Sequence, residues 1–197
     1  MHKTARNSSK DESPLGGVLD QQDLDGLFRL LDAGANVNEL TRSGSLLRRT
    51  ILAFEAHPRL HEAVVELLKR GADPTLLTDD HGGPLFSAVI IRDTEIVRLL
   101  LEAGAQPNAE WDWPESLYEW AEFDYRYEEL GLDLPEEPSS QDRETEDAWL
   151  QFLERIAVAY GRRPPDYLRL LRAHGAKTSR ELEADGRTHP GTHGPMQ

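Results

Sequence analysis

Cysteine is absent from this chain of 197 residues, and several kinds of protein are excluded with it. Without thiols there is no disulfide framework, no thiolate zinc site, no iron–sulfur cluster and no cysteine nucleophile. A reducing compartment fits this composition. A chain of this length can bury a hydrophobic core large enough to fold without such cross-links.

Long apolar runs are also missing. No segment approaches the roughly 18 consecutive apolar residues that a membrane span needs. The first residues, MHKTARNSSKDESP, lack the apolar stretch of a secretory signal. We therefore expect a soluble, cytoplasmic protein that makes no contact with a membrane.

Basic residues are scarce relative to acidic ones. The chain has 22 Lys and Arg against 36 Asp and Glu, a formal net charge of −14. Residues 110–147 hold fifteen acids and only two bases, Arg126 and Arg143, so nearly all of the excess lies in this segment. Such a charge disfavours nucleic-acid phosphate and anionic lipid as partners. The expected partner is a basic protein, with no direct contact to nucleic acid.

Motifs for catalysis and metal binding are absent as well. The sequence contains no phosphate-binding glycine loop, dinucleotide fingerprint, serine nucleophile elbow, zinc-protease HExxH or calcium loop. His57 and His61 are four residues apart, but Pro58 lies between them and no third ligand is near. Paired glutamates in a solvated run lack the burial that tunes a general acid. We expect no enzymatic activity, no catalytic residue, no metal site and no cofactor.

What the chain does contain is an internal repeat. Four segments align: LLDAGANVN at 30–38, LLKRGADPT at 67–75, LLEAGAQPN at 100–108 and LLRAHGAKT at 170–178. Each has a Leu-Leu pair at the end of a helical apolar pattern, followed by glycine and alanine. Glycine suits the position just after a helix, where φ is usually positive and a Cβ would clash. The pattern predicts a helix end at each glycine.

A second signal precedes two of these helices. SPLGGV at 13–18 and GPLFSA at 83–88 each place a proline 20 residues before the glycine, and proline is favoured in the first turn of a helix. Each repeat thus reads as helix, turn, helix, glycine and loop. This resembles the ankyrin repeat, with its T-P-L-H-x-A and G-A-D-x-N patterns. The resemblance covers 13–178, is best at 83–108, and implies an all-α fold: a short ankyrin-repeat solenoid of helix-turn-helix units.

The fourth repeat is enlarged, because its Leu-Leu segment comes about 38 residues late. Residues 130–142 have the prolines, serines and charge of an exposed loop. After them, Ala148, Phe152, Ile156 and Tyr160 recur at the helical spacing of four. The sequence therefore predicts an inserted helix within an insertion at about 130–163.

The expected organisation is a flexible N-terminus at 1–12, an ankyrin-repeat domain at 13–178 and a disordered tail at 179–197. The second repeat has four extra residues, which lengthen either its first helix or the turn after it.

Aromatic residues gather in the acidic segment. Seven of the fourteen lie within 111–127. A helix over about 115–129 places Leu117, Trp120 and Ala121 on its inner face, and these we assign to the core. Exposed aromatic rings bordered by charge are typical of protein interfaces, since desolvated rings supply affinity and charges at the edge steer the partner.

The ankyrin resemblance implies a concave binding face made of loop tips and the far ends of the first helices. The predicted partner-binding residues are Leu77, Asp79, Asp80, Ile90, Ile91, Glu110, Trp111, Asp112, Trp113, Glu115, Phe123 and Asp124.

These observations lead to one hypothesis and two alternatives. The leading hypothesis is an acidic interaction module, acting as a monomer, that neutralises a basic enzyme or toxin such as a nuclease, in the manner of an immunity protein. The first alternative is a general ankyrin adaptor that tethers a basic segment of a regulatory partner. The second is an enzyme subunit or a metal-dependent hydrolase that uses the acidic insertion.

Overall fold

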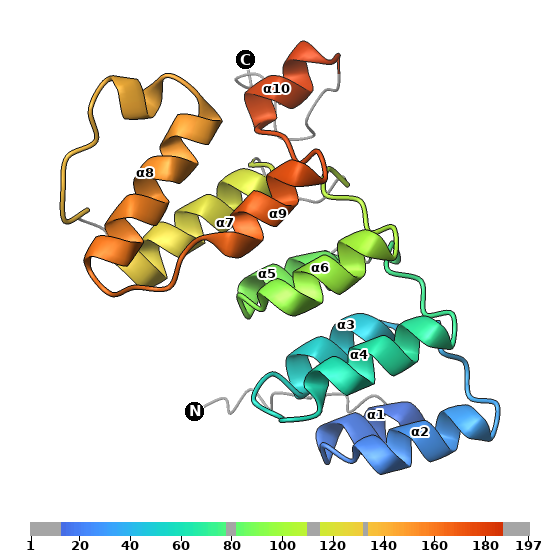
Figure 1. Ribbon diagram of the computed structural model, residues 1–197. Coiled ribbons are helices and arrows are strands. Elements are labelled where there is room, and N and C mark those ends of the chain that lie inside the picture. Colours follow the sequence, from blue (N-terminus) through green and yellow to red (C-terminus); the bar gives the residue numbers. More distant parts are fainter. Residues whose placement is uncertain (1–12, 78–81, 110–114, 132–133, 187–197) are drawn as a thin grey trace, which may run out of the picture. The chain divides into compact units, whose positions relative to one another are not determined.

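The computed structural model describes residues 13–77, 82–109, 115–131 and 134–186. The chain divides into two compact units, Met1–Pro84 and Leu85–Gln197. In the described residues, helices dominate both units (Figure 1), and the first unit also contains a two-stranded hairpin. The predicted all-α fold class is confirmed.

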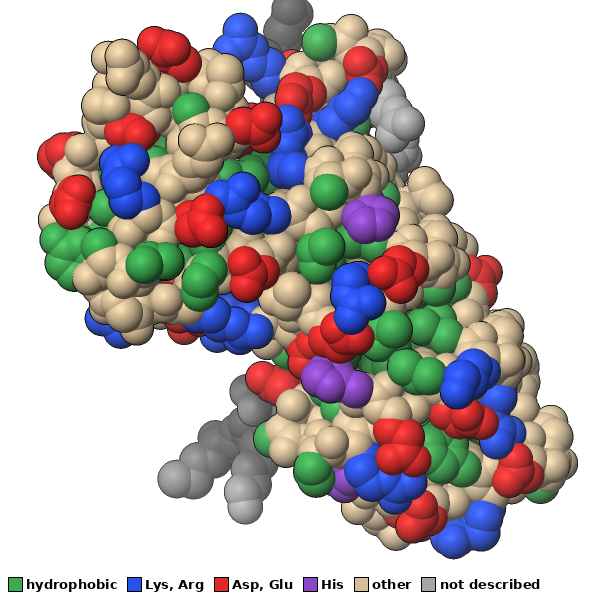
Figure 2. Space-filling model, viewed as in Figure 1, with side chains coloured by type: hydrophobic (Ala, Val, Ile, Leu, Met, Phe, Trp, Pro, Cys, Tyr) green, Lys and Arg blue, Asp and Glu red, His purple; other side chains and the backbone are tan. Residues whose placement is uncertain are grey.

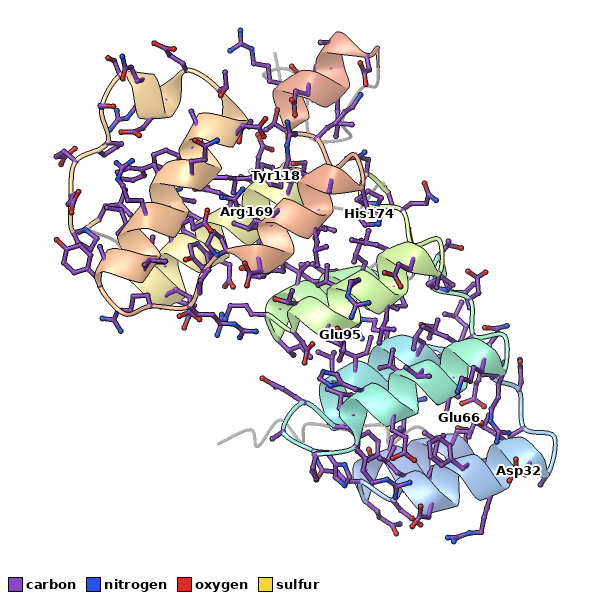
Figure 3. The ribbon with its side chains drawn as sticks, in the orientation of Figure 1. Asp32, Glu66, Glu95, Tyr118, Arg169 and His174 are labelled. Atoms are coloured by element: carbon purple, nitrogen blue, oxygen red, sulfur yellow. The ribbon has the colours of Figure 1, made fainter. Side chains whose placement is uncertain are left out.

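The first unit contains two helix pairs and the hairpin. Its elements are α1 (Pro14–Asp20), α2 (Leu24–Asp32), β1 (Leu40–Thr41), β2 (Gly44–Ser45), α3 (Leu46–Ala53) and α4 (Leu60–Lys69). Helix α1 packs against α2 and α3, and α3 packs against α4. Leu27, Leu47 and Val64 are buried between them. At the surface Arg70 pairs with Asp32 of α2 and Glu66 of α4, both labelled in Figure 3.

The helix ends follow the predicted signals. Ser13 caps α1 by accepting a hydrogen bond from the Gly16 amide at 3.1 Å, and Pro14 occupies the first turn. The glycine of each repeat has a positive φ: 93° at Gly34, 86° at Gly71, 100° at Gly104 and 83° at Gly175. The predicted helix end at each glycine is therefore confirmed.

The extra residues of the second repeat lie mainly in a turn. The α3–α4 connection spans 54–59, whereas the α1–α2 connection spans only 21–23. Helix α3 has eight residues, one more than α1. Of the two predicted possibilities, the turn takes up most of the added length.

The second unit contains the remaining helices. They are α5 (Pro84–Ile90), which begins at the unit boundary, α6 (Thr94–Glu102), α7 (Leu117–Tyr125), the π-helix η1 (Arg126–Leu130), the 3₁₀ helix η2 (Gln141–Arg143), α8 (Glu146–Ala159), α9 (Asp166–Ala173) and α10 (Ser179–Ala184). Helix α9 packs against both α6 and α7, and α8 packs against η1 and η2 (Figure 1). The inserted helix α8 is thus part of the core of this unit.

The apolar face of α8 is buried in the second unit, where the helix packs against η1 and is hydrogen-bonded to α7. Phe152 and Ile156 are fully buried, and Trp149 donates a hydrogen bond from Nε1 to the Glu122 carboxylate at 2.7 Å. Tyr160 departs from the predicted apolar row: it is 49% exposed. Helix α8 ends at Ala159, so Tyr160 caps the helix and its side chain lies outside the buried face.

Asparagine side chains join successive repeats. Asn38 donates from Nδ2 to the Gly71 carbonyl at 3.0 Å, and its Oδ1 accepts from the Asp73 amide at 2.8 Å. Asn108 makes the same pair of bonds, to the Gly175 carbonyl at 2.7 Å and from the Lys177 amide at 2.8 Å. Helix α9, which follows the insertion, is therefore joined to the third repeat in the same way as α4 of the second repeat is joined to the first.

The predicted disordered tail needs a correction at its start. Residues 179–184 form α10, which begins with a capping box between Thr178 and Glu181. Glu119 of α7 accepts hydrogen bonds from the amides of Ser116 and Ser179 at 3.0 and 3.1 Å, so one carboxylate holds the starts of two helices. Burial opposes ionisation of Glu119, but the hydrogen bonds from Ser179 and Ser116 outweigh it and lower its pKa. The hydrogen bonds that this carboxylate accepts order a segment whose composition alone indicated disorder.

Candidate protein-docking site

Half of the predicted docking residues lie outside the described residues. They are Asp79, Asp80, Glu110, Trp111, Asp112 and Trp113. Their assignment to a docking face stays a prediction.

The other six predicted residues belong to different units. Leu77 is in the first unit, where its partly exposed side chain lies over Gly83. Ile90 and Ile91 are half-buried at the end of α5 in the second unit, and Glu115 is exposed just before α7. Phe123 and Asp124 follow each other on α7, where Phe123 is exposed and Asp124 is half-buried.

Helix α7 is held firmly on its inner face. Ser116 and Glu119 form a capping box at its start. Leu117 and Ala121 are buried, as predicted, while Trp120 is half-buried with its ring 5.0 Å from that of Phe86. A rigid inner face fixes the direction of the side chains on the outer face.

One further residue of α7 strengthens this packing. Tyr118, labelled in Figure 3, is buried, and the guanidinium of Arg172 on α9 lies over its ring at 5.1 Å. Burial, followed by the nearby charge of Glu146, raises the pKa of the Tyr118 hydroxyl. The neighbouring helices α8 and α9 are themselves tied by an ion pair between Glu154 and Arg169.

The outer face of α7 carries two exposed aromatic rings. Phe123 is 54% exposed and Tyr127, one turn later on η1, is 51% exposed. Their rings are nearly parallel, with an angle of 21° and centroids 6.4 Å apart. A stacked pair with both rings half in water is the kind of apolar surface that a partner can desolvate.

The residues that follow these two rings in the sequence are mostly acidic, and carboxylates outnumber basic groups among their contacts. Arg92 donates to Asp124 at 3.0 Å, and its guanidinium lies 3.9 Å from both Glu128 and Glu129. Burial works against the charge of Arg92, but the hydrogen bond and charge of Asp124, with the charge of Glu128, raise its pKa. One guanidinium therefore faces three carboxylates, which leaves this surface locally acidic.

Backbone geometry positions both sides of this cluster. Arg92 has a φ of 53°, rare for a residue with a side chain, at the tight turn between α5 and α6. On the other side η1 prolongs α7 as a π-helix, a form that often occurs at functional sites. Tyr127, Glu128 and Glu129 were missed as site residues; the spacing of four between Phe123 and Tyr127 was the signal that could have found them.

Acidic and basic side chains also occur together on other parts of the surface. On the face shown in Figure 2, acidic and basic side chains are interspersed, with small groups of hydrophobic side chains between them. An open cleft of about 650 Å³ between the start of α8 and α10 is lined by Arg143, Arg180, Glu144, Glu146 and Glu181. Glu181 is already paired with Arg172, so this cleft favours neither sign of ligand.

Two further findings concern the described residues alone. Within residues 13–77, 82–109, 115–131 and 134–186, no group of three or more His, Asp and Glu side chains is arranged to hold a metal ion. The helices in that part of the chain are all too short or too polar to cross a membrane.

Helix-turn-helix units that end on a glycine and are joined by asparagine define a repeat protein built as a scaffold. The family model for the ankyrin repeat matches residues 83–112. The same glycine and asparagine geometry recurs in the other copies, which supports an ankyrin-repeat protein. Ankyrin repeats bind protein partners and are typically not enzymes, so the protein is a protein–protein interaction module.

A solved structure also resembles this chain. The crystal structure of the human ASB11 ankyrin repeat domain is similar to 84% of this chain and 85% of its own, with 20% sequence identity and a TM-score of 0.47. No curated protein matches the sequence.

Proposed function

We propose that this protein binds a basic enzyme or toxin and blocks its activity, in the manner of an immunity protein. The observation that carries the proposal is the exposed pair of Phe123 and Tyr127 beside a surplus of carboxylates. Rings that lose water on binding supply affinity, and the surrounding charge selects and steers the partner.

The distribution of charge supports a basic partner. Residues 110–147 carry fifteen of the 36 acids in the chain and two of its 22 bases. Part of this charge is already used inside the protein, because Glu122 binds Arg126 and Asp124 binds Arg92. Glu128 remains substantially exposed, so the surface still attracts cationic groups over a Debye length of about 8 Å at physiological salt.

An enzyme or toxin is a suitable target because many such proteins bind phosphate through cationic sites. An acidic surface competes directly for such a site. Blocking requires only that the two surfaces fit, which agrees with a scaffold fold. The predicted residues Glu110, Asp112 and Trp113 would extend the same docking face.

The test is capture followed by an activity assay. The tagged protein is used to capture partners at low salt, and the captured protein is identified by mass spectrometry and purified. We expect a basic protein whose own activity is abolished at a 1:1 ratio, with association that slows as salt rises. The double variant Phe123→Ala/Tyr127→Ala should weaken binding by roughly 30-fold or more, as for an interface hot spot.

Tyr160→Ala is the matched control, because Tyr160 has a similar exposure to Tyr127 but lies at the end of α8. It should leave binding unchanged. A captured partner that keeps full activity while bound would contradict the inhibitor proposal, and a partner with an acidic binding surface would contradict the role of the carboxylates.

A further inference from the structure

The ring pair exists because the first helix of the fourth repeat continues beyond its usual end. Helix α5 stops at Ile90 after seven residues, whereas α7 has nine and is followed by the five residues of η1. Tyr127 and Glu128 lie on this extension, at positions for which α5 has no equivalent helical residue. The surface they form is therefore specific to the enlarged repeat.

The charge beside the rings is only partly neutralised. Asp124, Glu128 and Glu129 face the single guanidinium of Arg92, and only the Asp124 contact is a hydrogen bond, at 3.0 Å. Arg126, the base within η1, is bound by Glu122 at 2.6 Å. Of the three carboxylates, Glu128 is the most exposed, with 44% of its side chain accessible. It follows Tyr127 directly and is open to a second cation.

Arginine and lysine side chains would fit this surface differently. A guanidinium is planar, so it can stack on an aromatic ring while its edge donates two hydrogen bonds to a carboxylate. A lysine ammonium is a compact, strongly hydrated charge that is also attracted to an aromatic face but cannot stack flat on it. Arg92 already shows that this acidic cluster accommodates a guanidinium.

We propose that Phe123, Tyr127 and Glu128 form a docking site selective for an arginine side chain of the partner. This inference rests on the proposed function, since it names the chemistry of the basic partner. The rings supply the stacking surface, and the Glu128 carboxylate binds the edge of the guanidinium.

The test compares two labelled peptides of equal length and charge, one with six arginines and one with six lysines in the same glycine-serine background. Binding to the full chain is measured by fluorescence anisotropy. We expect the arginine peptide to bind about tenfold more tightly, the size of difference that one stacked, partly desolvated cation supplies. Phe123→Ala/Tyr127→Ala should abolish this preference, and Glu128→Gln should reduce it.

Tyr160→Ala again serves as the control and should keep the preference intact. Equal binding of both peptides by the wild-type chain, or a preference that survives in the double variant, would overturn the arginine site while leaving the basic partner in place. Binding of neither peptide would overturn the proposed basic partner as well, so the two failures are distinguishable.

Discussion

The joint within the first unit and the joint across the insertion are built from the same two hydrogen bonds. Asn38 reaches Gly71, which is 33 residues further along the chain, and Asn108 reaches Gly175, which is 67 residues further. The bond lengths differ by only a few tenths of an ångström. The insertion therefore doubles the chain length between two repeats without changing how the repeats meet.

The comparison teaches where a repeat protein can accept new sequence. The added residues enter between α7 and α9, the two helices of one repeat, and α8 packs against η1 and is hydrogen-bonded to Glu122 of α7. The asparagine joint that connects neighbouring repeats is the same in both places. What changes is the first helix, which gains η1 and with it the exposed Tyr127 and Glu128.

The largest expected effect comes from the core of the insertion. Phe152→Ala removes a fully buried ring that stacks on Trp149 at 5.3 Å, and we expect a loss of about 3–5 kcal/mol in the free energy of unfolding. Urea unfolding measures it. The control is Val158→Ala on the same helix, where the side chain is 66% exposed, and the change should stay within about 0.5 kcal/mol. If Phe152→Ala lowered the free energy of unfolding as little as Val158→Ala does, α8 would have to fold separately from the repeats.

An intermediate effect is expected at the two joints. Asn38→Ala and Asn108→Ala each remove two hydrogen bonds to backbone groups, with an expected cost of about 1–2 kcal/mol. Chemical unfolding of both variants should give similar losses if the joints are equivalent. A large loss at Asn38 with none at Asn108 would show that the packing of the insertion, rather than the asparagine, holds α9 in place.

The smallest effect concerns acid stability at α10. A hydrogen bond with Arg172 is the main cause that lowers the pKa of Glu181 to about 2, from an ordinary value of 4.5. Because the folded-state pKa is depressed, this carboxylate stabilises the fold above pH 4.5, and that contribution is lost as the pH falls from 4.5 towards 2. The two side chains are partly exposed, at 21% for Arg172 and 39% for Glu181, and solvent screens the pair, so we expect less than about 1 kcal/mol.

Thermal unfolding between pH 7 and pH 2.5 checks this dependence. Glu181→Gln should lower the melting temperature at pH 7 and have little effect at the acidic end. Glu183→Gln, at an exposed position of the same helix, is the control and should follow the wild type. A wild type and a Glu181→Gln variant with parallel pH profiles would contradict the role of this ion pair.

The sequence by itself determined the repeated unit, because its signals act over a few residues. Proline at a helix start, glycine at a helix end and the spacing of the leucines depend on local backbone geometry, and each was confirmed at the expected position. The buried Leu117 and Ala121 followed from the helical period alone.

Only the tertiary structure decided the details that depend on distant partners. Tyr160 continues the helical period of α8, yet it is exposed because the helix ends one residue earlier. Residues 179–184 look polar and tail-like, yet Glu119, some 60 residues away, holds the start of α10. The pairing of Arg92 with Asp124 likewise joins residues 32 apart. Periodicity reports which residues share a face of one helix, whereas exposure and ion pairing depend on what the rest of the chain places against that face.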